Sequence, residues 1–463
     1  MAYYEYKLGN NAEYIIDTKL KTYILHLKSI CLHVFSTGVL ILSIDCENHK
    51  ENQHDESSIL LINEFGRRIY PQYLGNSEPR TAAVKSNFLA SKIILNPDLG
   101  TNPIEDNFER FDDLTKLTTK GYYTTEGTTS YRDQMVIHAP KFISGLFNAH
   151  FAFNQHEHLD HKNGLIRLSR VMDDRMFFQC WYDNTKKANA LAIPTKVDNT
   201  FMRIENEYLP AYATDKFWYS FMFGDKNQDD PSINDDNLQA NQILTHTYSR
   251  WYDYKRKSGQ YDGTLYGFTR DSFVCIGGCF VLPHIQTMYY QIAVLCLAQR
   301  STALRYSGEV ANLTPIKSKP QKMVRRIRSL HLHYVEFINK LYFREVTSQI
   351  QGIEMYNQLQ DIMQIHKDVK DLDSEIQELH SYVTMYEQAL IAKITTVGVP
   401  FAIVFGILGA NIFQNGMVLG NTPDFNALKW IGCGLLISII TILILPFIFN
   451  SCIPIFRKLR KSL

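Results

Sequence analysis

Two long apolar stretches lie near the C-terminal end of the chain. They run from about Ile394 to Phe413 and from about Leu428 to Asn450. At roughly 20 and 23 residues, each is long enough to cross a bilayer core of about 30 Å as a helix. The short polar connection between them predicts a tight hairpin, so the pattern predicts two membrane-spanning helices that return the chain to its starting side.

The segment before these stretches has the hydrophobic spacing of one long amphipathic helix. Apolar residues recur in steps of three and four: Ile353, Tyr356, Leu359, Ile362, Ile365, Val369, Leu372, Ile376, Leu379, Val383, Tyr386 and Leu390. We expect one helix from Gln321 to Ile394, about 110 Å long, with Gly352 as a tolerated weak point. A stripe of this length needs a helical partner, most simply copies of itself.

The first three hundred residues combine strand and helix patterns. His33–Glu47 alternates and is rich in β-branched residues, which predicts a strand, and "SILLINEF" predicts the strand that returns from it. Ser272–Leu282 predicts a further strand, and the apolar spacing of His284–Leu313 predicts a helix. The expected fold is therefore an α+β domain, followed by a long stalk helix and two transmembrane helices.

These patterns divide the chain into six parts. They are a sensor-like α/β domain over 1–315, a stalk helix over 316–393, a first span over 394–413, an outer loop over 414–427, a second span over 428–450 and a basic tail over 451–463. The tail "RKLRKSL" is strongly basic, whereas the loop carries only Asp424 near its middle. The positive-inside rule places both termini in the cytoplasm of a multi-pass inner-membrane protein.

Composition narrows the function classes. The net charge is +1, so no global field points to direct nucleic-acid binding. The eight cysteines form no CxxC pair, which argues against a zinc ribbon or a disulfide scaffold. The sequence contains no Walker loop, GxGxxG, GxSxG or HExxH motif, and "MAYYEYKLGNNAEY" does not have the form of a signal peptide. We therefore expect no enzyme and no covalent cofactor.

The end of the first span carries a motif. "FGILGANIFQ" places Gly409, Ala410 and Asn411 at the mouth of the span, and Pro400 lies in its middle. With the two spans, the short loop and the basic tail, this arrangement resembles the CorA family of pentameric divalent-cation channels, in which a Gly-Met-Asn motif closes the first span. The resemblance implies a homo-pentamer whose first span lines a pore.

Two positions depart from that family. Ala410 replaces the Met of the motif, and Leu408 replaces the usual aromatic residue before its Gly. The outer loop also lacks the acidic character of the magnesium transporters. These departures weaken the expectation that Mg²⁺ is the transported ion. They leave the expected pore architecture unchanged.

The N-terminal region resembles a narrower group. "FSTGVLILSI…ILLINEFGRRIYP" and "HIQTMYYQIAVLCLAQRSTALRYS" look like the CorA-like membrane effectors found beside type III CRISPR systems. That resemblance implies a channel opened by a nucleotide second messenger, the adduct of S-adenosylmethionine and AMP, made on detection of viral RNA. The cytoplasmic domain would be the sensor.

The candidate pore residues lie on the first span. A ring of Asn411 amides, repeated by symmetry, would present carbonyl oxygens to a hydrated cation. Besides Asn411, Thr395 and Thr396 offer oxygens within the span, and no acidic residue occurs there. Apolar residues spaced by three and four would form a dewetting gate, or would face lipid or the second span: Val397, Phe401, Val404 and Leu408.

The candidate ligand residues are arginines. Arg67 and Arg68 follow a Gly, where paired guanidinium groups would clamp a phosphate or lie solvated at a hairpin end. Arg270, Arg300 and Arg305 are similar candidates, with Asp271 or Glu309 as alternative partners. The basic run "KSKPQKMVRRIR" fits a solvated helix start or an anion-attracting surface.

Two alternatives remain open. In a magnesium transporter of the same fold, cytoplasmic Mg²⁺ bridging Asp368, Asp371 or Asp373 between subunits would close the pore. In a membrane-anchored coiled-coil signalling protein, the spans would form no pore, and Asn411 would only cap its helix. Complementation of a magnesium-starved strain and ion flux in liposomes separate these alternatives from a gated effector channel.

Overall fold

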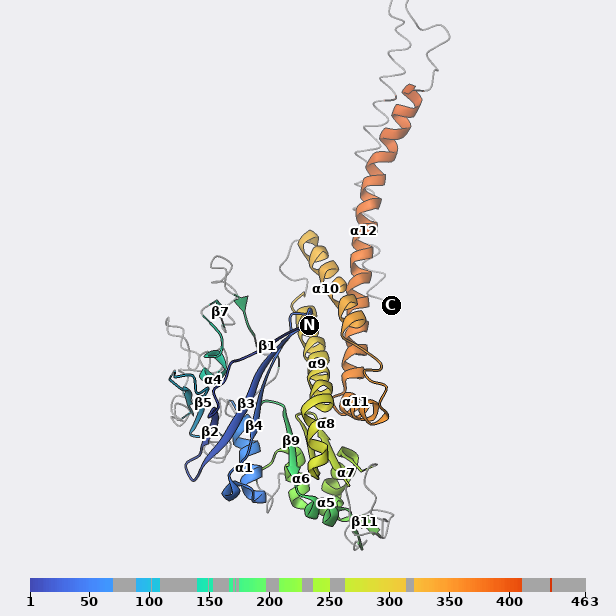
Figure 1. Ribbon diagram of the computed structural model, residues 1–463. Helices are drawn as coiled ribbons and strands as arrows, with labels where there is room; N and C mark the ends of the chain where they lie inside the picture. The colour runs from blue at the N-terminus through green and yellow to red at the C-terminus, as the bar shows by residue number, and fades with distance from the viewer. Residues whose placement is uncertain are drawn as a thin grey trace, which may run out of the picture. The chain divides into compact units, whose positions relative to one another are not determined.

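The computed structural model of the protein forms two compact units. Unit 1 comprises Met1–Thr314 and Leu332–Asp373, and unit 2 comprises Pro315–His331 and Ser374–Leu463. The structure describes residues 1–69, 89–100, 102–108, 140–148, 150–152, 166–169, 171, 175–196, 208–226, 236–249, 263–313, 320–409 and 434. The expected α+β content, with a sheet domain and long helices, is confirmed (Figure 1).

The first sheet of unit 1 is antiparallel. Its strands are β1 (Ala2–Glu5), β2 (Glu13–Asp17), β3 (Thr22–Val34), β4 (Leu40–Glu47), β5 (Lys92–Asn96) and β6 (Ile104–Asn107). β3 pairs with β4 along one edge and with β2 and β1 along the other, and the sheet continues from β2 through β5 to β6. Burial alternates along β2 and β5, so one face of the sheet packs into a core.

The segment His33–Glu47 is a hairpin turn with its second strand rather than one strand. The amide of Phe35 donates to the carbonyl of Val39, and the amide of Gly38 donates to the carbonyl of Phe35, both at 2.9 Å. Gly38 has φ +76°, a conformation that glycine adopts without steric cost. The expected strand content is right, but the single strand is wrong because "STG" supplies a turn.

The segment "SILLINEF" is helical, so the expected returning strand is wrong. It lies in α1 (Glu56–Arg67). The carboxylate of Asp55 accepts a hydrogen bond from the amide of Ser58 at 2.9 Å and caps the helix. The hydroxyl of Tyr14 donates to the carbonyl of Gly66 at 2.8 Å and ties α1 to β2. The N-cap and the tertiary contact together outweigh the β-branched composition.

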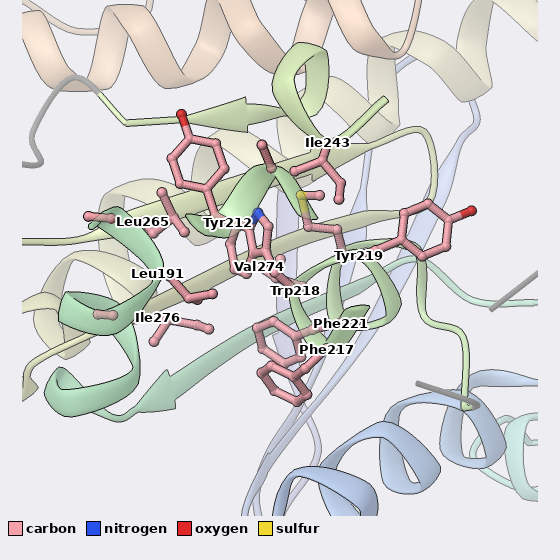
Figure 2. Packing of buried hydrophobic residues seen from close by; sticks show 14 of the residues in the cluster. Leu191, Tyr212, Phe217, Trp218, Tyr219, Phe221, Ile243, Leu265, Val274 and Ile276 are labelled. Carbon is pink, nitrogen blue, oxygen red and sulfur yellow. The ribbon is translucent and has the colours of Figure 1, made fainter. Parts of the chain in front are cut away.

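A second sheet and three helices build the other core of unit 1. The strands are β9 (Phe178–Asp183), β12 (Thr247–Tyr248), β13 (Leu265–Thr269) and β14 (Ser272–Gly277), in the order β12-β13-β14-β9, with β14 and β9 parallel. The helices are α5 (Thr185–Ala192), α6 (Lys216–Phe223) and α7 (Asp236–His246). Trp218 is fully buried in this core, and the Phe217 and Phe221 rings stack at 5.5 Å (Figure 2).

Short elements complete the described part of unit 1. They are α4 (Lys141–Ser144), the strand pairs β7 (Phe151–Ala152) with β8 (Ile166–Arg167) and β10 (Pro194–Lys196) with β11 (Tyr208–Pro210), and 3-10 turns at Glu51–Gln53, Ala211–Thr214 and Cys279–Val281.

The helix expected over His284–Leu313 is present. It consists of α8 (Leu282–His284), a π-helical turn (Ile285–Tyr289) and α9 (Tyr290–Ala311). The strand β14 before it is shorter than the expected Ser272–Leu282, because a 3-10 turn follows its glycines. α9 contacts β4 and α11 within unit 1.

The single helix expected from Gln321 to Ile394 is instead three helices. They are α10 (Pro320–Lys340), α11 (Ile350–Ile362) and α12 (Ile365–Gly409). The amides of Leu341 and Tyr342 both donate to the carbonyl of Phe337, which closes α10. Gln364 adopts φ +57° and separates α11 from α12. The apolar spacing continues across both breaks, which is why the sequence predicts an unbroken helix.

Candidate ligand site and pore helix

Two of the expected arginines lie at the C-terminal end of α1. Arg67 and Arg68 are both buried, at 3% and 4% exposure, although the sequence allows solvated side chains there. Both pair with Glu64, which accepts from Arg68 Nε at 2.6 Å and from Arg67 Nη2 at 3.2 Å. The helical spacing of three and four brings one buried carboxylate against two guanidinium groups.

Arg67 joins α1 to the second core of unit 1. Its Nη2 also donates to the carbonyls of Phe223 (3.2 Å) and Gly224 (3.0 Å), and its guanidinium lies over the Phe178 ring at 4.8 Å. Gly224 has φ +62°, and a Cβ there would collide with this guanidinium. Within the described chain, Arg67 Nε and Nη1 have no hydrogen-bond partner. Burial is the main cause of the lowered pKa of Arg67, with Arg175 and Arg68 adding to it.

A third arginine, Arg175, lies beside this pair. Its backbone forms an isolated antiparallel bridge with that of Arg68, and its Nη2 pairs with Asp271 Oδ2 at 3.2 Å. At 38% exposure, its side chain reaches solvent where Arg67 and Arg68 do not. Nothing in the sequence singles out Arg175, because only the fold brings it next to α1, and "DDRMFF" carries no recognisable motif.

Asp271 extends the charge cluster to α9. Its Oδ1 lies 3.8 Å from Arg300 Nη1, and the same Nη1 donates to the carbonyl of Arg270 at 2.7 Å. Arg270 itself is exposed. The structure thus brings four of the five expected arginines into one connected region of unit 1, through Arg175 and Asp271.

The charge of Arg300 also interacts with that of Asp368 in the first turn of α12. The pKa of Arg300 is lowered by burial and by the charge of Arg270, and is raised by Asp271 and Asp368. Among the described residues, Arg300 Nε and Asp368 Oδ2 are buried without a hydrogen-bond partner. A buried cation with unmet donors responds strongly to a change in nearby charge, so Arg300 is suited to couple the arginine cluster to α12.

Arg305, the fifth expected arginine, lies apart from this cluster. It donates to the carbonyl of Thr37 in the β3–β4 turn and pairs with Glu309 at 3.0 Å. These contacts hold the β3–β4 turn against α9. Arg305 therefore pairs with Glu309, which is the alternative to ligand binding that the sequence offers.

The expected metal ligands of α12 have separate surroundings. Asp368 is half-buried near Arg300, Asp371 is exposed, and Asp373 Oδ1 accepts a hydrogen bond from Tyr334 at 2.9 Å. The described residues contain no group of three or more His, Cys, Asp or Glu side chains placed to hold a metal ion. Mg²⁺ bridging between subunits therefore stays a prediction.

The end of α12 contains the expected pore segment. Thr396 donates its hydroxyl to the carbonyl of Ala392 at 2.7 Å, and Pro400 lies inside the helix. Val397, Val404 and Leu408 belong to α12, and Gly409 is its last residue. Ala410 and Asn411 lie outside the described residues, as do the outer loop, the basic tail and, apart from residue 434, the second span.

Apolar side chains along this end of α12 are exposed. They are Met385, Leu390, Ile391, Ile394, Val399, Phe401 and Ile403, at 40% to 63% exposure. Earlier apolar residues of the same helix, such as Ile365, Leu372 and Val383, are buried. The exposed apolar side chains from Leu390 to Ile403, here called the exposed apolar end of α12, therefore form a surface that water solvates poorly.

In the part of the chain that the structure describes, one helical stretch is long and apolar enough to cross a membrane. It is Cys279–Ala311, and 33% of its most apolar window is buried in the protein. This is weak support for membrane association, since core helices of soluble proteins can be equally long and apolar.

Comparison of the chain with protein-family models, with curated proteins and with solved structures finds no match.

Proposed function

We propose that this chain is a membrane ion channel whose pore wall is the exposed apolar end of α12 and whose gate responds to a ligand bound by unit 1. The observation that carries the proposal is the change in burial along one helix, from Ile365 at 0% exposure to Ile394 at 63%. A bilayer and further copies of the chain would cover the apolar end. The homo-oligomer, pentameric by its resemblance, forms the pore.

The interior of the apolar end supports a pore wall better than a simple anchor. Pro400 has no amide hydrogen, so the carbonyl of Thr396 lacks its helical donor. Irregular backbone at membrane depth is tolerated where it faces protein or a water-filled cavity. In the channel, Phe401 and its neighbours one turn away form the apolar constriction, and Asn411 supplies the amide ring at the mouth.

The arginine cluster of unit 1 supports a phosphate-bearing ligand. Arg67 and Arg68 both donate to Glu64, and the backbone of Arg68 forms a bridge with that of the partly exposed Arg175. Guanidinium forks match phosphate oxygens. A bound anion near Arg175 competes for its pairing with Asp271 and so changes the charge that Arg300 meets. Arg300 passes this change to Asp368 in the first turn of α12, which tilts the helix and widens the constriction.

By its resemblance to CRISPR-associated effectors, the ligand is the adduct of S-adenosylmethionine and AMP, and the physiological result is antiviral growth arrest by ion leakage. The arginine cluster is consistent with the phosphate of such a nucleotide, and the resemblance alone supplies its identity.

Ion efflux from liposomes that contain the purified chain tests the proposal. We expect efflux that rises when the S-adenosylmethionine–AMP adduct is added. Arg175→Gln should weaken the response to ligand by about tenfold or more, since a hydrogen bond to a charged group contributes about 1.5–3 kcal/mol. Arg300→Gln should retain ligand binding, measured by calorimetry, and lose the rise in efflux.

Arg344→Gln, at an exposed arginine outside the cluster, is the matched control and should respond like the unchanged chain. Absence of efflux with correct assembly would indicate a membrane anchor without a pore. Magnesium-selective efflux that ignores the nucleotide would instead support a magnesium transporter. Either outcome contradicts the gated channel.

A further inference from the structure

We propose that the first turns of α10 form a basic surface that binds the phosphate headgroups of anionic lipids. Lys322, Arg325 and Arg326 are exposed, and their spacing places them on one helix face. The apolar residues between and beyond them are buried and fix the orientation of the helix: Met323, Val324, Ile327 and Leu330. The inference rests on the proposed function, because it requires the apolar end of α12 to lie in a bilayer.

Two contacts within unit 2 set the direction of α10 against α12. The guanidinium of Arg328 pairs with the carboxylate of Glu387, and the rings of His331 and His380 stack with centroids 5.0 Å apart. A later residue of α10 thus meets an earlier residue of α12, so the two helices run antiparallel. The start of α10 therefore lies alongside the part of α12 that follows Glu387.

Because the two helices are antiparallel, the basic surface lies beside the start of the apolar end of α12. Lys322 precedes Arg328 by six residues, which is about 9 Å along a helix. The same distance along α12 leads from Glu387 to Lys393, which lies between the exposed residues Ile391 and Ile394. The three cations thus lie where an apolar transmembrane segment begins, at the depth of the lipid phosphates.

The charge of this surface suits lipid phosphate. Among the described residues of this stretch of α10, Arg328 forms an ion pair with Glu387. The three cations of the surface, in contrast, face solvent. The net charge of the whole chain is only +1, so the surface is a local concentration of positive charge. Juxtamembrane lysines and arginines are attracted to anionic leaflets by about 1 kcal/mol each, and arginine adds bidentate hydrogen bonds to phosphate.

Native mass spectrometry of the full chain, purified from membranes that contain equal phosphatidylglycerol and phosphatidylcholine, tests this inference. We expect the chain to retain phosphatidylglycerol preferentially. The variant Lys322→Gln/Arg325→Gln/Arg326→Gln should lose that preference, by up to about fivefold for each cation removed. The control Lys340→Gln/Arg344→Gln/Lys367→Gln removes the same charge from exposed positions away from the start of α10 and should keep the preference.

The outcomes separate this inference from the proposed function. If the unchanged chain is not recovered in the membrane fraction, the membrane channel itself is contradicted. If it inserts but retains both lipids equally, or if the triple variant keeps the preference, only the lipid surface is overturned. Loss of oligomeric state in the triple variant, measured by light scattering, would assign the surface to contacts between copies and would also overturn it.

Discussion

The protein contains two apolar helical segments with opposite surroundings. In α9, buried apolar positions are interspersed with buried polar ones, among them Gln299, Arg300 and Thr302, and each of these three has a hydrogen-bond partner. In the apolar end of α12, apolar side chains are exposed. By length and hydropathy alone, the helical stretch Cys279–Ala311, which contains α9, could cross a membrane.

Burial by neighbouring elements, rather than apolar composition, therefore distinguishes a helix of a protein core from a helix suited to a membrane. The polar side chains of α9 match acceptors and donors in unit 1: Gln299 Nε2 donates to the carbonyl of Leu341 at 2.9 Å and to the Tyr356 hydroxyl at 2.8 Å. Such partners would be lost in lipid. On this basis we propose that α12, and not α9, crosses the membrane.

The largest difference between the two helices is expected when the same charge is placed on each of them. Ile292→Asp in α9 should destabilise unit 1 by at least about 3 kcal/mol, because it buries an unpaired charge. Ile403→Asp in α12 should leave the thermal unfolding of unit 1 unchanged and should prevent membrane integration. Differential scanning calorimetry and alkaline extraction of membranes measure the two effects. The assignment is wrong if the two variants exchange phenotypes.

A smaller effect is expected from the polar network of α9. Gln299→Leu leaves the carbonyl of Leu341 and the amide of Gln360 without their Gln299 partner, which should cost about 1–3 kcal/mol in unfolding free energy. Gln388→Leu, on the exposed surface of α12, is the control and should change stability little. Denaturant titrations of both variants decide this. An equal loss in both would show that Gln299 has no special role.

The smallest expected difference is in pH dependence. Burial lowers the pKa of His33, whose imidazole shares a hydrogen bond of 2.7 Å with the hydroxyl of Tyr290 at the start of α9. A histidine with a lowered folded-state pKa supports the fold fully above its usual pKa of 6.5. This contribution to the free energy of unfolding is lost as the pH falls below 6.5 toward the folded-state pKa. The Tm of unit 1 should therefore drop on acidification.

His33→Gln should show a flatter dependence of Tm on pH over that range. A control at His54, which is exposed, should keep the slope of the unchanged chain. An identical slope in the His33 variant would mean that other groups cause the acid sensitivity.

The sequence predicts local elements well where pattern and environment agree. The helix after His284 and the strand that begins at Ser272 follow directly from apolar spacing. α1 was missed because its β-branched residues mask an N-cap formed by Asp55. The breaks after Lys340 and Met363 were missed because an amphipathic stripe reports which face is buried and not whether the backbone is continuous.

The candidate ligand site was only partly accessible to sequence analysis. Paired arginines after a glycine suggest an anion site, and four of the five expected arginines do meet. Their connection depends on Arg175 and Asp271, which the fold brings together over nearly a hundred residues of sequence. Long-range placement of this kind leaves no periodic trace in the sequence.

The most direct test of the central claim is a cysteine scan along α12 from Thr395 to Gly409, in the full chain reconstituted in planar bilayers. If this helix lines a pore, a charged thiol reagent should reduce the current through variants at every third or fourth position, with Phe401→Cys among them. The unsubstituted chain, with its native cysteines, is the control. Current that persists after reagent at every position, or no current from any assembled variant, would contradict the claim.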